Sequence, residues 1–235
     1  MTHGTPTHEP AQASTGAVQP DAIVAAFMAL LAEKRFEDIG FGELARRAGI
    51  SLAELRGKHS SKIEMLAAHL REVDRAVLAG IDVAMADEPP RERLFDVLMR
   101  RLDALVPHKD AVRSLQRSVM VNPGLALALN GLAVRSMQWM LTAADISASG
   151  PKGMVRSQGL ALLFASVLRT WLDDDDPGRA RTLAALDRAL ASGQRWAGFL
   201  DDLCRIPEAA CSARRALRRR RRDGRGERDG ETAAA

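Results

Sequence analysis

The sequence predicts an all-α protein, with a three-helix unit near the amino end and a larger helical bundle behind it. Apolar residues recur at intervals of three and four almost everywhere from residue 21 onward, which is the spacing of amphipathic helices. No segment shows the strict alternation of apolar and polar residues that is typical of a strand. Prolines, glycines and serines divide the chain into pieces of helix length, and 235 residues are enough to bury a sizeable core.

Residues 1–20 contain almost no apolar side chains. We expect a disordered N-terminal arm there, because such a segment cannot bury enough surface to offset the entropy of ordering. The first helix follows, with Asp21 placed as its N-cap. Its buried face is expected to comprise Ile23, Val24, Phe27, Leu30 and Leu31.

Three further helices are expected over residues 42–48, over residues 52–58, and from residue 61 to the residues before Pro89. Gly49 ends the first of them, because glycine readily adopts the left-handed conformation found just after a helix. Ser51, with Glu54 three residues later, has the spacing of a capping box and starts the second. Ser61 is expected to start the third.

The second half of the chain predicts five helices, over residues 91–106, 109–121, 124–145, 153–172 and 177–205. They are separated by Pro107, by Pro123, by a glycine-containing loop at 150–153 and by four consecutive aspartates before Pro177. Proline is favourable at the first position of a helix, since its missing N–H would be unpaired there. The last helix is therefore expected to begin at Pro177.

The formal net charge of +4 is unevenly distributed. Residues 212–235 hold nine arginines against four acidic residues, which gives +5 and leaves −1 for the rest of the chain. We expect a basic, disordered tail over 206–235, because the consecutive arginines 218–222 repel one another. Such a tail can add nonspecific DNA affinity, attract an anionic membrane surface, or simply keep the chain in solution.

The segment 41–66 carries the most informative pattern. Its two short helices are joined by a tight connection, which predicts a helix-turn-helix corner. In such a corner the second helix enters the major groove, its first residues lie near the base edges, and nearby cations neutralise phosphates. The residues expected to contact DNA are Arg46, Arg47, Ser51, Leu52, Ala53, Arg56, Lys58 and Lys62. The alternative is a solvated basic face on an ordinary bundle.

Several motifs occur together over roughly residues 21–70: an opening helix, Phe36 near its end, the stretch ELARRAGIS, Leu55 in the third helix, and SSKIEML at the start of the fourth. As a set they resemble the TetR family of bacterial one-component repressors. This chain has Arg56 and His59 in the region where such repressors usually show an aromatic pair, and it has no tyrosine.

The resemblance implies a TetR-like fold in a homodimer. Each subunit would have a DNA-binding head at 21–70 and a helical body at 71–205, which binds a small effector and pairs through its last two helices. The dimer interface is expected to include Leu160, Leu163, Val167, Leu183, Leu186 and Leu190. Large, soft apolar side chains on adjacent helices are expected either to line an effector pocket or to form plain core; they are Met99, Met120, Met137, Trp139, Met140, Phe164 and Trp171.

A second set of motifs lies within residues 91–195: RLFDVLMRRLDALVPH, MQWML, and VLRTWLDDDDPGRARTLAALDRAL. This part is similar to the lipid-binding accessory protein of ubiquinone biosynthesis, whose fold is itself TetR-like. The similarity implies a lipid or isoprenoid ligand, a head that does not bind DNA, and a membrane-docking helix. Two hypotheses therefore stand, a DNA-binding regulator and a lipid carrier with a vestigial head. The basic residues around the corner favour the regulator, whereas Arg56, His59 and the similarity of residues 91–195 favour the carrier.

Enzyme and metal sites find little support in the sequence. Cys204 and Cys211 can form neither a disulfide framework nor a four-cysteine zinc site, the five histidines lack ligand spacing, and no glycine-rich phosphate loop follows a strand. The consecutive aspartates 173–176 cannot all converge on one ion, so we expect a structural role for them. We predict no catalysis, no cofactor and no metal. A cytoplasmic location is expected, because the chain shows no secretory signal and no apolar run of membrane-spanning length.

Overall fold

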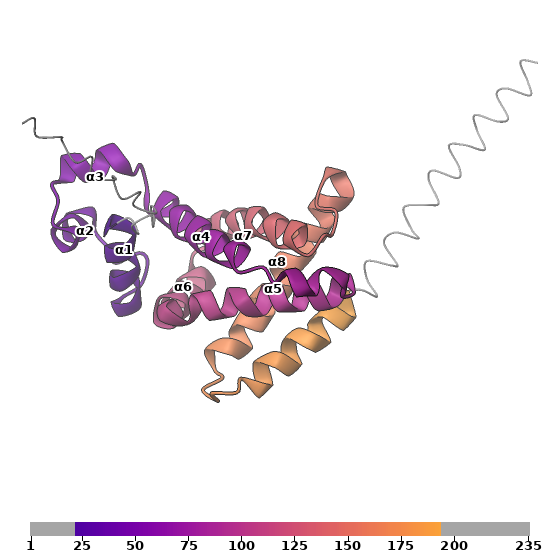
Figure 1. The fold of residues 1–235 in the computed structure, drawn as a ribbon. Coiled ribbons are helices and arrows are strands. Elements are labelled where there is room, and N and C mark those ends of the chain that lie inside the picture. Colours follow the sequence, from indigo (N-terminus) through magenta and orange to yellow (C-terminus); the bar gives the residue numbers. More distant parts are fainter. Residues whose placement is uncertain (1–21, 194–235) are drawn as a thin grey trace, which may run out of the picture.

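The computed structural model describes residues 22–193, and every regular element in that range is helical (Figure 1). The elements are α1 (Ala22–Glu33), α2 (Phe41–Ala48), α3 (Leu52–Lys58), α4 (Lys62–Ala79), η1 (Val83–Asp87), α5 (Pro90–Leu105), η2 (Val106–His108), α6 (Lys109–Val121), α7 (Pro123–Ala143), α8 (Gly150–Leu172) and a further helix over residues 180–193. The predicted all-α class is confirmed. The predicted arm, the Asp21 cap, the two cysteines and the basic tail lie outside the described residues.

Most helices begin and end within a few residues of the predicted positions, because local signals set these boundaries. Ser61 caps α4 as predicted, and its Oγ accepts the N–H of Glu64 at 3.1 Å. The end of this fourth helix is an exception, since the sequence predicts that it continues to the residues before Pro89. Helix α4 ends at Ala79 with Gly80 as its C-cap, and Asp82, which accepts the N–H of Ala84, starts the separate 3-10 helix η1.

The last helix differs from the prediction, since it begins at residue 180 rather than at Pro177. Asp176 explains the shift: its carboxylate accepts the N–H groups of Gly178 and Ala180, each at 3.3 Å, so Pro177 lies in the turn before the helix.

The head of the molecule consists of α1, α2, α3 and the first part of α4, packed around a small apolar core. Phe27 and Phe36 meet edge to face in this core, with ring centroids 6.3 Å apart. Ala111 of α6 and Leu125 of α7 belong to the same core, so helices of the body close one side of the head. Helix α4 runs without interruption through residue 70, the predicted domain boundary, and therefore joins head and body as one continuous helix.

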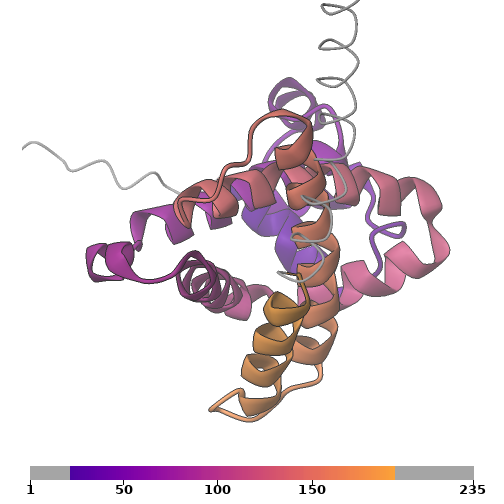
Figure 2. The same cartoon turned by 90° about the vertical axis from the view of Figure 1, so that its right-hand side faces the viewer.

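The body has its own apolar core, to which α4, α5, α7, α8 and the helix 180–193 all contribute. Figures 1 and 2 both show α8 and the helix 180–193 lying side by side as an antiparallel pair, in orange. Fully buried side chains at the centre of this core include Leu98, Leu102, Met137, Met140, Trp171 and Leu186. The two cores meet along α6 and α7.

Helix α6 and its C-cap Asn122 hold the loop between α1 and α2 by three side-chain hydrogen bonds at intervals of four residues, which we call the α6 ladder. Its first rung is the hydroxyl of Ser114, which donates to the carbonyl of Lys34 at 2.6 Å. The second is the fully buried Ser118, whose Oγ accepts the N–H of Phe36 at 3.1 Å. In the third, Asn122 donates to the carboxylate of Glu37 at 3.2 Å. The α6 ladder thus fixes the head on the body.

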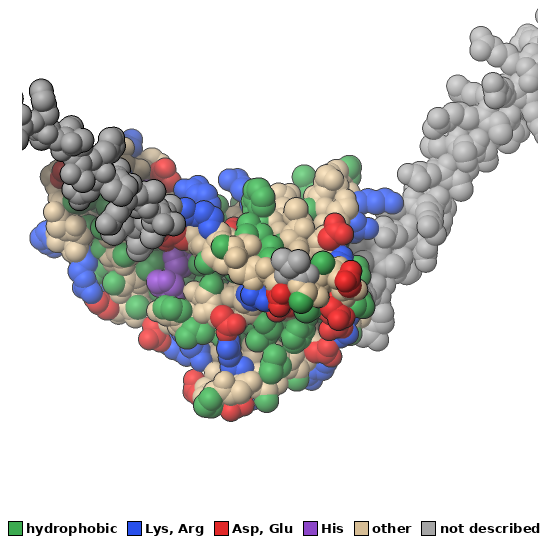
Figure 3. All heavy atoms as spheres, in the orientation of Figure 1, with side chains coloured by type: hydrophobic (Ala, Val, Ile, Leu, Met, Phe, Trp, Pro, Cys, Tyr) green, Lys and Arg blue, Asp and Glu red, His purple; other side chains and the backbone are tan. Residues whose placement is uncertain are grey.

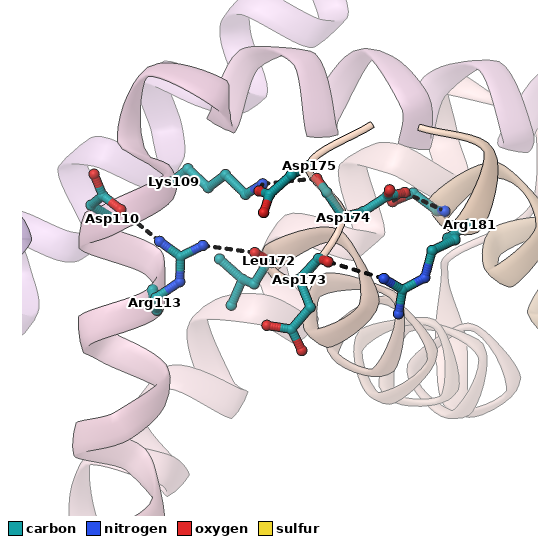
Figure 4. A network of polar contacts seen from close by, with 9 residues as sticks. Lys109, Asp110, Arg113, Leu172, Asp173, Asp174, Asp175 and Arg181 are labelled. Carbon is teal, nitrogen blue, oxygen red and sulfur yellow. Dashed lines mark hydrogen bonds and ion pairs between the residues drawn. The ribbon is translucent and has the colours of Figure 1, made fainter. Parts of the chain in front are cut away.

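The opposite end of α6 is tied to the turn that follows α8 (Figure 4). Lys109 Nζ donates to the carbonyl of Asp174 at 2.9 Å and pairs with Asp175 at 3.3 Å. Arg113 donates to the carbonyl of Leu172 at 2.7 Å. The side chain of Asp174 is buried and accepts both the N–H and the hydroxyl of Thr182. These aspartates therefore have structural partners, as expected, and α6 connects the head to the last two helices.

Candidate nucleic-acid interface

The corner between α2 and α3 is built by one glycine and a few apolar side chains. Gly49 ends α2 with φ 68°, a left-handed conformation that strains any residue with a Cβ. The next residue folds back, and the N–H of Ile50 donates to the carbonyl of Ala45 at 3.0 Å. Leu44 and Leu55 are buried beneath the corner. Helix α3 is consequently held on the outside of the head, at the far end of the molecule from the helix 180–193 (Figure 1).

The start of α3 is stabilised by the predicted capping box. Ser51 Oγ accepts the N–H of Glu54 at 3.1 Å, while the N–H and the hydroxyl of Ser51 both donate to Glu54 Oε2 at 2.8 Å. These hydrogen bonds lower the pKa of Glu54. The side chains that follow the cap point outward, with Leu52 57% exposed and Ala53 also exposed.

Cations surround this outward face. Arg46, Arg56 and Lys58 are exposed, and none of the three forms an ion pair with another residue between 22 and 193. We call the exposed set Arg46, Ser51, Leu52, Ala53, Arg56 and Lys58 the α2–α3 surface. Figure 3 shows lysine and arginine side chains at this end of the molecule. The helix α3 protrudes here, and within the described residues no acidic side chain forms an ion pair with these three cations. A protruding helix with uncompensated positive charge is typical of a surface that binds a polyanion.

Two of the residues predicted to contact DNA already have partners within the head, Arg47 in an exposed ion pair and Lys62 in a half-buried position. Arg47 forms an ion pair with Glu33 of α1 at 2.5 Å, and this contact lowers the pKa of Glu33. Lys62 is half-buried, its Nζ donates to the carbonyls of Phe36 and Ile39 at 2.6 and 3.1 Å, and it lies 4.5 Å from the ring centroid of Phe36. Burial lowers the pKa of Lys62. Lys62 therefore fastens α4 to the loop between α1 and α2, a role that its place in the sequence did not reveal.

The residues predicted to line an effector pocket are divided by the structure. Five of them lie in or against the body core: Met99, Met137, Met140, Phe164 and Trp171. Met120 and Trp139 do not join them, because these side chains are 82% and 55% exposed on the surfaces of α6 and α7. Both residues satisfy helical spacing, but a long helix has apolar positions on more than one face, and spacing alone does not say which face meets the core.

The predicted dimer residues are divided in the same way. Four of them are buried within the core of a single protomer: Leu160, Val167, Leu186 and Leu190. Leu163 is half-buried and Leu183 is 36% exposed. The fully outward apolar side chains of α8 are different ones, Met154, Val155 and Leu162. A partner subunit can reach this second face without opening the protomer core.

Sequence reasoning missed a buried ion pair in the body. Arg101 of α5 is 2% exposed and donates to Asp74 of α4, which also accepts the hydroxyl of Ser136 at 2.6 Å. The guanidinium lies 5.6 Å from the ring centroid of Phe164. A signal was present, since Arg101 occupies the buried face that Leu94, Val97, Leu98, Leu102 and Leu105 define on α5.

A polar groove of about 420 Å³ lies where the end of α1 and the following loop face α6. It is lined by Ala32, Glu33, Lys34, Arg35, Asp38, Asp110, Arg113, Ser114 and Arg117. Charges of both signs line it, which distinguishes it from the apolar pocket expected for the effector.

Neither a metal cluster nor a membrane-spanning helix occurs between residues 22 and 193. In that range, no three histidine, cysteine or acidic side chains lie close enough together to hold a metal ion. None of the helices described there combines the length and the apolar character needed to cross a membrane.

Comparison with solved structures identifies the fold. The chain is similar to a TetR transcriptional regulator from Nitrosomonas europaea ATCC 19718, with a TM-score of 0.58 and 23% identity over 74% of this chain and 97% of that one. A TetR transcriptional regulator from Rhodococcus sp. RHA1 gives a TM-score of 0.53 and 21% identity over 73% and 93% of the two chains. No family model and no curated protein matches the sequence.

These similarities confirm the predicted TetR-like fold, with a three-helix head and a larger helical bundle. At such identities they establish the architecture alone. The predicted likeness of residues 91–195 to the ubiquinone accessory protein is not confirmed by them and stays a prediction.

Proposed function

We propose that this protein is a cytoplasmic, DNA-binding transcriptional regulator of TetR type. The observation that carries the proposal is the α2–α3 surface: a short helix held outward at the end of the molecule, with Arg46, Arg56 and Lys58 exposed and without ion pairs in the described chain. Cations of this kind can each replace a counterion at a phosphate without first giving up an ion pair within the protein. The TetR-like architecture of the neighbouring structures supports the same function.

In this function α3 enters the major groove with its first turn toward the base edges. Arg46, Arg56 and Lys58 bind backbone phosphates, which sets affinity and register but carries little sequence information. We leave Arg47 and Lys62 out of the phosphate-binding set, because Glu33 and two backbone carbonyls already hold them. Ser51 and Glu54 keep the helix start rigid.

We further propose a homodimer that pairs through the outward face of α8 and the helix 180–193. The apolar side chains that support this face are Met154, Val155, Leu162 and Leu183, all at least 36% exposed in the single chain. A two-fold axis through such a face makes the same patch serve both subunits. It also places two heads on a pseudo-palindromic operator, with half-sites separated by one helical turn or a multiple of it.

The effector in this proposal is a small apolar molecule bound within the body core. Met99, Met137 and Met140 support this site, since thioethers adapt to irregular ligands. Helix α6 offers the connection to DNA binding, because it contacts the turn after α8 at one end and the head through the α6 ladder along its length. An effector that favours a different position of α6 would change the spacing of the two heads, and DNA would in turn change effector affinity.

Fluorescence anisotropy tests the DNA-binding function. The full chain is titrated with a labelled duplex from the region upstream of its own gene and with a scrambled duplex, at two salt concentrations. We expect selective binding whose affinity falls steeply with salt. In Arg46→Ala and Arg56→Ala the salt slope should be smaller by about one, because each variant neutralises one phosphate fewer. The opposite outcome is that the chain binds both duplexes with equal affinity and no longer binds either after residues 212–235 are removed. This result would show that the tail alone binds DNA.

The competing hypothesis, a lipid carrier with a vestigial head, rests on the sequence similarity of residues 91–195. Mass spectrometry of the purified full chain distinguishes it from the regulator. A co-purified isoprenoid quinone or phospholipid, together with no selective DNA binding, supports the carrier.

A further inference from the structure

We propose that α3 recognises thymine methyl groups in its operator, with Leu52 as the contacting side chain and with Ala53 and Gly57 as the narrow surface that lets the helix approach the bases closely. This inference rests on the proposed DNA-binding function and names what the α2–α3 surface reads. The inference depends on which side chains of α3 are already hydrogen-bonded within the protein and which are exposed without such a bond.

The polar side chains at the start of α3 are engaged with each other. The hydroxyl of Ser51 donates to Glu54 Oε2 at 2.8 Å, and its oxygen accepts the N–H of Glu54 at 3.1 Å. Reading a base edge with either side chain would require breaking the capping box that starts the helix. Leu52 lies between Ser51 and Glu54 in the sequence, and its side chain is 57% exposed. The main side chain that the start of α3 can present to a base is therefore apolar.

The face of α3 opposite the buried Leu55 carries almost no side-chain volume. Ala53 and Gly57 are four residues apart and lie on the same side of the helix. A Cβ atom built on Gly57 would meet nothing within 4 Å, so packing inside the protomer does not require glycine there. Glycine weakens a helix relative to alanine, and close approach of another molecule is a reason to keep it.

The charge near this face favours DNA as that molecule. Arg46, Arg56 and Lys58 are exposed on α2 and α3, which suits a polyanion rather than an apolar protein surface. In the major groove the one apolar group on a base edge is the C5 methyl of thymine, and alanine, threonine methyl and similar side chains contact it. Leu52 is the residue of α3 that is long enough and exposed enough to bury this methyl group.

Replacement of thymine by deoxyuridine tests the proposal, because it removes only the methyl group. A duplex bound by the full chain is first recovered by in vitro selection. Each thymine of the half-site is then replaced, symmetrically in both halves, and affinity is measured by fluorescence anisotropy at constant salt. We expect at least one position where the replacement weakens binding by about fourfold per half-site, the effect of exposing one methyl group.

The same replacements are repeated with Leu52→Ala. At the sensitive position this variant should bind the thymine and deoxyuridine duplexes equally, because the side chain that covers the methyl group has been removed. Leu127→Ala is the matched control, since Leu127 is a 75% exposed leucine on α7, away from α3. It should keep the full methyl effect.

Gly57→Ala tests the close approach. The change should raise the melting temperature slightly, because alanine favours a helix, and should weaken binding of the selected duplex by tenfold or more. Gly131→Ala is the matched control: Gly131 is exposed in α7 and also has open space around its Cα. It should raise stability and leave DNA affinity unchanged.

The outcomes separate the two claims. If selection recovers no preferred sequence, the proposed regulatory function fails. A preferred sequence that is bound equally with thymine and deoxyuridine at every position overturns the methyl recognition while the regulator stands. A Gly57→Ala protein with unchanged affinity overturns the close approach.

Discussion

Two arginines, one in the head and one in the body, show how differently the two regions use charge. Arg56 on α3 is exposed and has no ion pair in the described chain, whereas Arg101 on α5 is 2% exposed and donates to Asp74. The body charge is compensated within the protomer and contributes to its packing. The head charge lacks a partner until another molecule supplies one. Stability and binding should therefore respond to different sets of residues.

The largest effect is expected from Arg101→Ala. The change leaves the buried carboxylate of Asp74 without its cation, which costs about 3–5 kcal/mol in the free energy of unfolding. Urea unfolding followed by circular dichroism measures it. The double variant with Asp74→Leu and Arg101→Met should recover much of the loss, because it removes both charges together. A double variant as unstable as Arg101→Ala would contradict the role given to this pair.

The next effect concerns pH and the buried His69, which is 6% exposed and lies edge to face with His108 at a centroid distance of 4.4 Å. Burial, with smaller contributions from His108 and Arg101, lowers the pKa of His69 from 6.5 to about 4. Between these values the unfolded chain binds a proton that the folded chain does not, so stability falls as pH falls through this window.

Across this window the free energy of unfolding is expected to change by about 3 kcal/mol. Urea unfolding at a series of pH values between 7 and 4 measures it. His69→Gln should reduce the dependence above pH 4.5 and leave the part that comes from His108, whose pKa is also lowered by burial. The stability that depends on Glu54 and Glu64, whose pKa values are lowered by hydrogen bonds, is lost at lower pH. An unchanged slope in the variant would assign the pH dependence to other groups.

Ser118→Ala should have a moderate effect at the boundary between the two regions. It leaves the buried N–H of Phe36 without its acceptor, which costs about 1–3 kcal/mol. Hydrogen exchange of the Phe36 amide should accelerate more than that of amides in the body core, such as Leu102. Ser166→Ala, on an exposed face of α8, provides the control and should change neither value.

The smallest effect on stability is expected from Arg56→Ala, within about 0.5 kcal/mol of the parent chain. Its DNA affinity should nevertheless fall by a similar factor for every sequence tested, because a phosphate is the same at every base pair. Thermal melting and anisotropy on the same preparation measure both quantities. A large drop in melting temperature would mean that Arg56 serves the fold, and the contrast with Arg101 would disappear.

Much of the fold could be predicted from the sequence, because caps and breaks are local. Ser51, Ser61 and Gly49 each act within a few residues of their position, and they determine where α3 and α4 begin and where α2 ends. The outward position of Leu52 follows from the same local geometry.

The rest of the site depends on contacts that are distant in sequence. Lys62 meets carbonyls of a loop more than twenty residues earlier, and the periodicity of α4 gives no sign of it. Trp139 and Leu186 each fit an apolar helical pattern, yet one is 55% exposed and the other fully buried. A repeat of 3.6 residues marks an apolar face but does not identify the element that covers it.

The α6 ladder has a further consequence, which concerns how the head can move. Ser114 and Ser118 lie four residues apart on one side of α6, and Asn122 follows at the same interval as the C-cap, where the backbone is extended. A turn of α6 by one residue rotates that side by about 100°, which takes the two serines away from the loop together. We expect Lys34 and Phe36 to lose their α6 partners in a single step, so that a rotation of α6 would release the loop rather than stretch its hydrogen bonds.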